Sequence, residues 1–369
     1  MLVVLYAFLI ITFIQLLFYI GIFGRFSFTK TPKATSEIPT IPISVIICAH
    51  NESENLQQFL PSFVNQKYSN YELVLINDAS SDDTLEIMES FQTAHPTKIK
   101  VVDVVANEQF WRSKKYALTL GIKASTHEHL LFSDADCKPV SEHWITEMAS
   151  HFTKEKSIVL GYGAYQKTSN SWLNKLIRFE TLFTAIQYFS YAKIGLPYMG
   201  VGRNLAYTES LFFSSNGFSN HMHIRSGDDD LFVNKNATSQ NISLSYVTDS
   251  FTLSEPKKSY KEWIHQKRRH VSTASHYKPI HKFLLALFYI SQILFWILAS
   301  ILLITTFQWK IVLGIILFRI LIQYLVIGTS AKKLNEKDLI IWAPILEMFL
   351  ILIQMSIFIK NTVSKPTHW

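Results

Sequence analysis

The sequence predicts an α/β protein with a mostly parallel sheet, helices on both faces of that sheet, and additional transmembrane helices. Two observations lead to this fold class. Long uncharged stretches near both ends raise the hydrophobic share of the 369 residues to 49% and the mean hydropathy to +0.16, which exceeds an ordinary soluble domain. Between those stretches, residues 24–282 alternate short apolar runs with amphipathic segments, the pattern of strands that are each followed by a helix.

The first apolar stretch, from Leu2 to Phe23, carries no charged residue. Its length suits a helix that crosses the hydrocarbon core, which takes ~20 apolar residues. A cleaved signal peptide is the alternative, but the stretch opens without Lys or Arg, lacks a small-x-small cleavage site and is longer than a signal core. We therefore predict a transmembrane helix over residues 1–23 and a linker over 24–41.

Three further apolar stretches, each near spanning length, lie within residues 283–359. They run from Phe283 to Phe307, from Ile311 to Gly328 and from Leu339 to Ile359. Arg319 and Glu347 interrupt the last two, and because a charge at bilayer depth is costly, these side chains should face helix neighbours or a cavity, in a structural or a functional role. We expect three transmembrane helices here, after a juxtamembrane segment at 271–282 and before a tail at 360–369.

Basic residues beside the apolar stretches predict how the chain crosses the bilayer. Arg25, Lys30 and Lys33 follow the first stretch, Lys278 and Lys282 precede the second, and Lys332, Lys333 and Lys337 separate the third from the fourth. If all four stretches span, these groups share one side, which the positive-inside rule makes the cytosol. The middle region is then cytosolic, whereas Lys360 and Lys365 at the C-terminus would lie outside.

The net charge of +7 and the two cysteines bound the partners and the compartment. A positive surplus fits a protein that works beside anionic lipid headgroups and handles an anionic donor molecule. Nucleic-acid binding is a weaker explanation, because Lys267 to Arg269 is the only dense basic run in the sequence. Cys48 and Cys137 make no disulfide framework, which indicates a reducing compartment.

The expected strands and helices of the middle region follow one another in order. Ile43 to Cys48 is an unbroken apolar run rich in β-branched residues, which predicts a buried parallel strand. A helix begins near Ser53, Glu72 to Ile76 forms the next strand, and Ser80 to Asp83 caps the next helix. The alternation continues with a strand over Lys98 to Val105, a helix over Lys114 to Lys123 and a strand over His129 to Ser133.

Polar clusters follow three of these strands, at Ala49 to Glu52, Asn77 to Ser80 and Asp134 to Asp136. The carboxyl ends of parallel strands lie at one edge of a sheet, where such folds bind ligands. In the D-x-D motif, Asp134 and Asp136 can face one divalent cation, and Mg²⁺ or Mn²⁺ often shares such a pair with substrate phosphates. A solvated turn capped by Asp is the alternative for this motif taken alone. Asp78 could accept hydrogen bonds from a base or a ribose over the sheet edge.

Two charged segments further along are candidates for chemistry. Gly227 to Leu231 holds three adjacent aspartates, whose repulsion can raise a pKa to suit a general base acting on a hydroxyl; the alternative is a solvated loop. Gln266 to His270 includes two arginines with forked donors for a diphosphate; the alternative is a basic cluster that contacts lipid headgroups. Trp172 to Ile194 is amphipathic, which favours a helix lying on the membrane or packed on the core.

In this order, the segments from about Pro42 to His270 resemble the family 2 inverting glycosyltransferases of GT-A fold, in the integral-membrane branch that includes cellulose, hyaluronan and poly-N-acetylglucosamine synthases and ceramide glucosyltransferase. The resemblance implies a GT-A nucleotide-sugar-binding catalytic domain over 42–270, with an interfacial helix near 172–194. Ser113 and Lys114 resemble the family's Gly-Lys pair, with Ser in place of Gly. His270 stands where the family's Gln-x-x-Arg-Trp motif has Trp, so the resemblance supports donor binding more than processive chain elongation.

The resemblance also implies the role of each site residue. Asp229 is the implied catalytic base, and Asp136 with Asp134 is the implied ligand pair for Mg²⁺ or Mn²⁺. Donor binding is implied for Ala49, Asn51, Glu52, Asp78, Lys114, Asp134, Gln266 and Arg269, and acceptor contacts for Asn204, Asp228 and His270. The implied reaction moves a sugar from a nucleotide sugar, with UDP favoured, to a lipid-linked or polysaccharide hydroxyl on the cytosolic face of a bacterial inner (plasma) membrane.

Two other functions compete with this one. A nucleotidyltransferase of similar fold would place a glycine-rich phosphate loop after the first strand, but Ala49 to Glu52 contains no glycine. A non-catalytic subunit of a polysaccharide assembly or export system would tolerate loss of the acidic residues. Asp78, the pair Asp134 and Asp136, and Asp229 are all present in this sequence. The sequence therefore favours the transferase.

Overall fold

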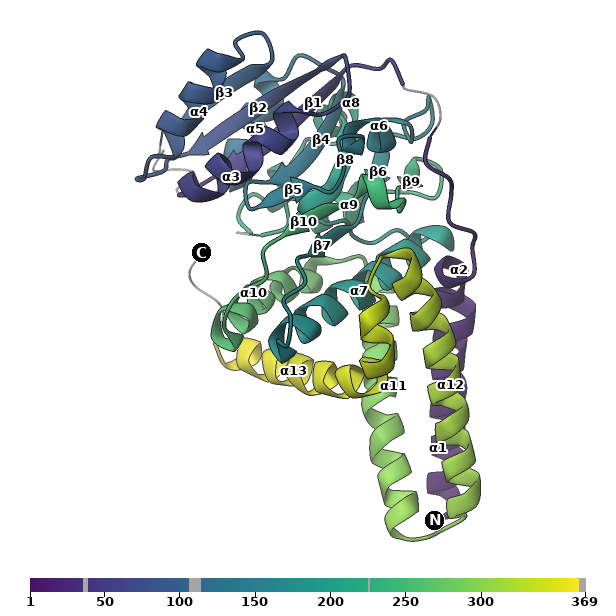
Figure 1. Ribbon diagram of the computed structural model, residues 1–369. Coiled ribbons are helices and arrows are strands. Elements are labelled where there is room, and N and C mark those ends of the chain that lie inside the picture. The colour runs from purple at the N-terminus through teal and green to yellow at the C-terminus, as the bar shows by residue number, and fades with distance from the viewer. Residues whose placement is uncertain (36–38, 106–113, 225, 365–369) are drawn as a thin grey trace. The chain divides into compact units, whose positions relative to one another are not determined.

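The structure of the chain, a computed structural model, describes residues 1–369 apart from 36–38, 106–113, 225 and 365–369. It forms two compact units. The sheet unit comprises residues 31–167 and 197–256, and the helical unit comprises residues 1–30, 168–196 and 257–369. Figure 1 shows the strands of the sheet unit and the long helices of the helical unit.

The sheet unit is built on a seven-stranded sheet in the order β3-β2-β1-β4-β8-β6-β9. The strands are β1 (Ile43–Ala49), β2 (Tyr71–Asp78), β3 (Ile99–Val104), β4 (His129–Asp134), β6 (Ile158–Leu160), β8 (Leu205–Thr208) and β9 (Ile242–Leu244). β3, β2, β1 and β4 are mutually parallel, whereas β8 runs antiparallel between β4 and β6. The predicted α/β fold with a mostly parallel sheet is confirmed.

Helices cover both faces of the parallel strands. α3 (Ser53–Val64), α4 (Thr84–Ala94) and α6 (Trp144–Ala149) share a core with Val45 and Ile47 of β1. α5 (Lys114–Ala124) covers the opposite face, where Gly121 comes so close that an added Cβ would collide with Ile76. Because successive strand residues point to opposite faces, a strand covered on both sides is apolar throughout, which explains the unbroken apolar run of β1.

Shorter elements complete the sheet unit. They are β5 (Cys137–Pro139), β10 (Thr252–Ser254) and β7 (Gly163–Tyr165), which form a small second sheet, and the helices α8 (Glu209–Ser214) and α9 (Asp230–Asn236). Short 3-10 turns lie at Gly202–Asn204, Ser219–His221 and Thr248–Ser250. The small sheet matters for the site because β5 directly follows the D-x-D motif.

Four helices of the helical unit are long and apolar enough to cross a membrane: Leu2–Ser27, Pro279–Ile304, Trp309–Lys333 and Lys337–Val363. The first combines α1 (Leu2–Leu16), a π-helical stretch (Leu17–Phe23) and α2 (Gly24–Ser27); the others are α11 (Pro279–Ile304), α12 (Trp309–Lys333), and a 3-10 turn (Lys337–Trp342) with α13 (Ala343–Val363). Each apolar stretch found in the sequence coincides with one of them, except that Phe283–Phe307 runs three residues past the end of α11.

Arg319 and Glu347 face each other inside the helical unit, 0% and 1% exposed. The Arg319 guanidinium donates to both Glu347 oxygens, at 2.7 and 2.8 Å. Gln15 of the first helix accepts a further bond from Arg319, and Gln292 of α11 donates to Glu347. As expected from the cost of an unpaired charge at bilayer depth, both side chains are turned toward helix neighbours.

The boundary predicted at residues 42–270 differs from the division seen in the structure. α7 (Trp172–Lys193) and α10 (Tyr260–Ser272) belong to the helical unit. The reason is packing. The ring of Phe183 in α7 makes an edge-to-face contact with the ring of Phe23. Arg178 of α7 forms ion pairs with Glu336 and Asp338, which follow α12. The sequence offered two positions for this amphipathic helix, on the membrane or packed on the catalytic core; in the structure α7 packs among the apolar helices of the helical unit instead.

Candidate active site

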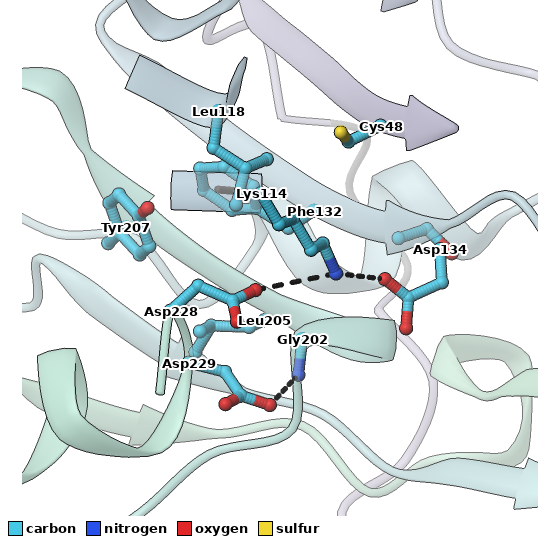
Figure 2. Close-up of a pocket in the computed structure, with 11 residues that line it drawn as sticks. Cys48, Lys114, Leu118, Phe132, Asp134, Gly202, Leu205, Tyr207, Asp228 and Asp229 are labelled. Carbon is cyan, nitrogen blue, oxygen red and sulfur yellow. Dashed lines mark hydrogen bonds and ion pairs between the residues drawn. The ribbon is translucent and has the colours of Figure 1, made fainter. Parts of the chain in front are cut away.

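The site lies where the strand order reverses. From β1 the chain moves outward through β2 to β3 and then returns to β4 on the other side of β1, so the connections leaving β1 and β4 diverge and open a crevice at their carboxyl ends. Cys48 near the end of β1 is paired with Asp134 at the end of β4. Both line a pocket with Lys114 and Asp229, which Figure 2 shows in close-up.

Lys114, the first residue of α5, links two acidic segments across this pocket. Its ammonium lies 2.8 Å from Asp134 Oδ1 and 3.4 Å from Asp228 Oδ2 (Figure 2). Burial alone would lower the pKa of Lys114, but the carboxylates of Asp134 and Asp228 outweigh burial and raise that pKa well above its usual value. Lys114 is therefore a fixed cation beside the acidic groups. Ser113, its expected companion, lies outside the described residues.

The D-x-D motif offers a donor set for a divalent cation. One ligand atom each from Asp134, Asp136 and Cys137 lie within 4.8 Å of one another. Burial, reinforced by Asp136 and Asp134, raises the pKa of the Cys137 thiol, and a thiol is in any case a soft ligand that hard cations do not prefer. Two carboxylates, with the remaining positions left to water and phosphate oxygens, suit a hard cation such as Mg²⁺. The residues therefore fit a divalent cation on Asp134 and Asp136.

Asp229 stands at the start of α9 and faces the same pocket (Figure 2). The amide of Gly202 donates to its Oδ2 and the amide of Asp230 donates to its Oδ1, both at 2.7 Å. Burial raises the pKa of Asp229 to about 8, and the neighbouring carboxylates of Asp228 and Asp230 add to that rise. A carboxylate with a pKa near neutrality is well suited to take a proton from a hydroxyl.

Hydrogen bonds tie the turn after β1 to the turn after β2. Asn51 has a φ of 57°, and its Oδ1 accepts from the amide of Ser81 at 2.8 Å. Asp82 accepts from the amides of Ser53 and Thr84, both at 3.2 Å, so it holds the first turns of α3 and α4 together. The two polar clusters are thus one continuous rim of the sheet, and Asp82 serves in capping, as the sequence predicts.

Asp78 ends β2 on this rim. His50 Nδ1 lies 2.6 Å from the Asp78 backbone oxygen. Burial raises the pKa of the Asp78 carboxyl above its usual value, although His50 and Lys114 act in the opposite direction. Asp78 and the turn from Ala49 to Glu52 therefore lie on the rim next to Cys48, which lines the pocket. Their donor-binding roles stay predictions.

Asn204, for which an acceptor contact is expected, lies inside the fold. This side chain is fully buried, and both its amide nitrogen and its amide oxygen have partners there. Its Nδ2 donates to the carbonyls of Tyr162 and Ser250 at 3.0 and 2.7 Å, and its Oδ1 accepts from the Trp144 indole at 3.0 Å. Asn204 therefore braces the backbone around β8, and its acceptor contact stays a prediction.

Three predicted residues lie in the helical unit. Gln266, Arg269 and His270 are all on α10, whereas Asp134 and Asp229 belong to the sheet unit. Their assigned contacts with donor and acceptor stay predictions, as does the acceptor contact of Asp228. The structure brings together Asp78, Lys114, Asp134, Asp228 and Asp229 within one unit.

Two basic residues of the site were missed in the sequence. Lys115 is completely buried, and its ammonium donates to the carbonyls of His221, Ile224 and Ser226 at 2.7 to 2.8 Å, directly ahead of the aspartate cluster. The sequence could have indicated that Lys115 is buried, because Lys115 shares a helix face with the apolar residues Leu118 and Ile122.

Arg203 is the second missed residue. Its guanidinium lies 4.3 Å from the centre of the Tyr165 ring and donates to the Gly163 carbonyl at 2.9 Å. Burial would lower the pKa of Arg203, but Tyr165, Cys137 and Asp136 outweigh it and keep the guanidinium charged. Nothing in the spacing of the sequence could place it beside the D-x-D motif, because β7 and β8 meet that motif only in the folded chain.

Substituting Lys115 tests the contacts between its ammonium and the buried backbone carbonyls ahead of the aspartate cluster. Lys115→Met should destabilise the protein by about 2–3 kcal/mol, because three buried carbonyls lose their charged donor. Thermal unfolding of the purified chain measures the loss, and hydrogen exchange should rise most around Asp228 to Asp230. Lys123→Met, at an exposed position on the same helix, is the matched control. Equal unfolding temperatures for the two variants would contradict the assigned role.

Part of the chain matches a known protein family. Residues 44–209 match the family described as "Glycosyl transferase family 2". The chain is 39% identical over 94 residues to a poly-beta-1,6-N-acetyl-D-glucosamine synthase of Staphylococcus epidermidis, covering 26% of this chain and 21% of the relative. It is 28% identical over 223 residues to the glycosyltransferase AglE of Haloferax volcanii, covering 58% of this chain and 66% of the relative. The matches thus span less than two thirds of these relatives.

A solved structure shares the fold over most of the chain. It is titled as mannosyltransferase PcManGT from Pyrobaculum calidifontis in complex with GDP-Man and Mn²⁺. The TM-score is 0.59 at 16% identity, and the match covers 90% of this chain and 98% of the other. This likeness supports the GT-A fold with its added helices.

Proposed function

We propose that this chain is a membrane-bound inverting glycosyltransferase that uses a nucleotide sugar, with UDP favoured; the match of residues 44–209 to glycosyl transferase family 2 supports this. The observation that carries the proposal is the pocket at the end of β1 and β4. There Lys114 joins Asp134 and Asp228, and Asp229 lies against the Gly202 amide. A cation, a metal-binding carboxylate pair and a base with a raised pKa are the groups that such a transfer needs.

Each residue has a distinct task in the proposed reaction. A Mg²⁺ or Mn²⁺ ion held by Asp134 and Asp136 would neutralise the diphosphate leaving group. Lys114 adds positive charge on the same side of the pocket, and Asp78 orients the base or ribose. Asp229 takes the proton of the acceptor hydroxyl while the acceptor oxygen bonds to the anomeric carbon and the bond to the diphosphate breaks. A single displacement of this kind inverts the anomeric centre.

The acceptor is proposed to be a hydroxyl of a membrane lipid, a lipid-linked sugar or a polysaccharide. Helices able to span a bilayer support this choice, because they hold the catalytic domain at a membrane surface. The basic residues beside those helices support a cytosolic catalytic domain, and we place the protein in a bacterial inner (plasma) membrane.

A donor panel tests the proposal. Membranes containing the full chain are incubated with radiolabelled UDP- and GDP-sugars and Mn²⁺, and label is followed into lipid and polymer fractions. One sugar should be transferred, and both EDTA and Asp136→Asn should remove at least nine tenths of that transfer. Asp83→Asn, at an exposed position outside the pocket, is the matched control and should retain it. If no donor is transferred or hydrolysed, the enzyme assignment is wrong.

A further inference from the structure

Three of the four candidate spanning helices form a bundle whose direction follows from its contacts. Phe8, early in α1, packs against Phe295, late in α11, with ring centroids 5.2 Å apart. At the other end of the bundle, Ser27 meets Ser330 of α12 with 2.7 Å between Oγ atoms. The first helix therefore ends, α11 begins and α12 ends on one side, from which the chain enters the sheet unit at Thr31. That side is called the catalytic side below.

The chain leaves α12 on the catalytic side, so an α13 that crossed from there would run parallel to α11. Later residues of α13 would then meet later residues of α11. The contacts run the other way. Glu347 accepts from Gln292, whereas Ile351, one turn further along, accepts from Tyr289, which is earlier in α11. Moving along α13 therefore leads back toward the beginning of α11.

The far end of α13 contacts a helix that precedes the bundle. Asn361 Oδ1 accepts from Arg268 Nε at 2.8 Å, and the Arg268 carbonyl accepts from Asn361 Nδ2 at 3.2 Å. Arg268 lies on α10, before α11 begins. The C-terminal end of α13 is thus on the catalytic side, and Figure 1 shows α13 lying across the axes of α11 and α12.

One face of α13 is an unbroken apolar stripe. Its large side chains recur every three or four residues and are exposed: Ile345, Met348, Leu352, Met355 and Ile359. The opposite face, with Leu346, Leu350 and Ile357, is buried within the helical unit. The exposed apolar side chains of α11 and α12, such as Ile297 and Leu317, belong to the same unit, so lipid chains are the occupant that suits the stripe.

We propose that α13 does not cross the bilayer: it lies in the leaflet on the catalytic side, with the apolar stripe against lipid chains, and leaves three crossing helices. The end of α13 at Val363 then stays on the catalytic side. This arrangement also removes an inconsistency of the four-span topology, because Lys360 joins the other basic flanking residues on one side of the membrane. The proposal does not depend on the transfer reaction.

Accessibility of introduced cysteines in sealed vesicles tests the topology. Ser364→Cys marks the end of α13, Lys154→Cys marks the sheet unit, and Thr305→Cys marks the turn between α11 and α12; the unsubstituted chain gives the background. With a membrane-impermeant maleimide, Ser364→Cys should react in the same vesicle orientation as Lys154→Cys and in the opposite one from Thr305→Cys. Reaction of Ser364→Cys together with Thr305→Cys would overturn the proposal.

Depth measurements test the lipid contact of the stripe. Nitroxide labels at Met348, Met355 and Ile359 should report nearly equal depths, with accessibility to oxygen exceeding accessibility to a polar nickel complex. A crossing helix would instead separate the first and last labels by about 16 Å along the membrane normal. A steady change in depth along the three positions, or water-like accessibility at all of them, would overturn the proposal.

Discussion

Asp229→Asn should lower kcat about a thousandfold, because the substitution removes the group that takes the acceptor proton and keeps its size. The donor KM should change little, since the side chain bonds the Gly202 and Asp230 amides and lies apart from the D-x-D carboxylates. Initial rates with the active donor from the panel measure both parameters. Comparable rates for Asp229→Asn and the wild type would remove Asp229 from the role of base.

Asp228→Asn is the matched comparison for this variant. Asp228 lies 3.4 Å from the Lys114 ammonium, so its expected part is to hold Lys114 in place, and its loss should cost about tenfold. If instead Asp228→Asn lowers kcat more than Asp229→Asn does, Asp228 is the residue that takes the proton of the acceptor hydroxyl.

The pH dependence gives an independent check on Asp229. Only the deprotonated carboxylate can accept a proton, and its pKa is raised to about 8, so the wild-type rate should rise with pH and level off above about pH 8. The residual rate of Asp229→Asn should lack this rise. The raised pKa also means that its contribution to stability is lost as pH increases through about 8, so the variant should not unfold more easily than the wild type at pH 9.

Glu347→Gln should destabilise the helical unit by about 3–5 kcal/mol. The substitution leaves the Arg319 guanidinium without its counter-charge at a position that is 0% exposed, and breaking a buried ion pair from one side is far more costly than replacing the whole pair. Thermal unfolding of the purified protein in detergent measures the loss. Unchanged unfolding would contradict the structural role of the pair.

Two further variants separate charge from packing. The double variant Arg319→Met, Glu347→Met removes both charges and should recover most of the stability lost in Glu347→Gln. Glu142→Gln breaks the ion pair with Lys67, in which the Lys67 and Glu142 side chains are 62% and 49% exposed. This substitution should change the unfolding temperature little. A double variant as unstable as the single one would show that the surrounding hydrogen bonds, and not the charge balance, stabilise this region.

Local sequence patterns were sufficient for the elements of the sheet unit and for the resemblance to the family 2 glycosyltransferases. β1 is apolar on both faces because helices cover both faces, and Asp134 and Asp136 follow a strand whose end could be read directly. The apolar helices were equally visible, because the hydrocarbon core requires a minimum run of apolar residues. These features depend on neighbours in the chain, so spacing reveals them.

Contacts between distant segments could not be read in this way. Asn204 matched an acceptor motif, and the folded chain surrounds its amide with Trp144, Tyr162 and Ser250. Lys114 bridges Asp134 at the end of β4 and Asp228 just before α9, which are far apart in the sequence. The direction of α13 likewise depends on which residues of α10 and α11 it meets. Composition determines which segments can be buried. Which side chains form hydrogen bonds or ion pairs with each other depends on the tertiary structure, because these interactions require an approach of about 3 Å that only tertiary packing provides.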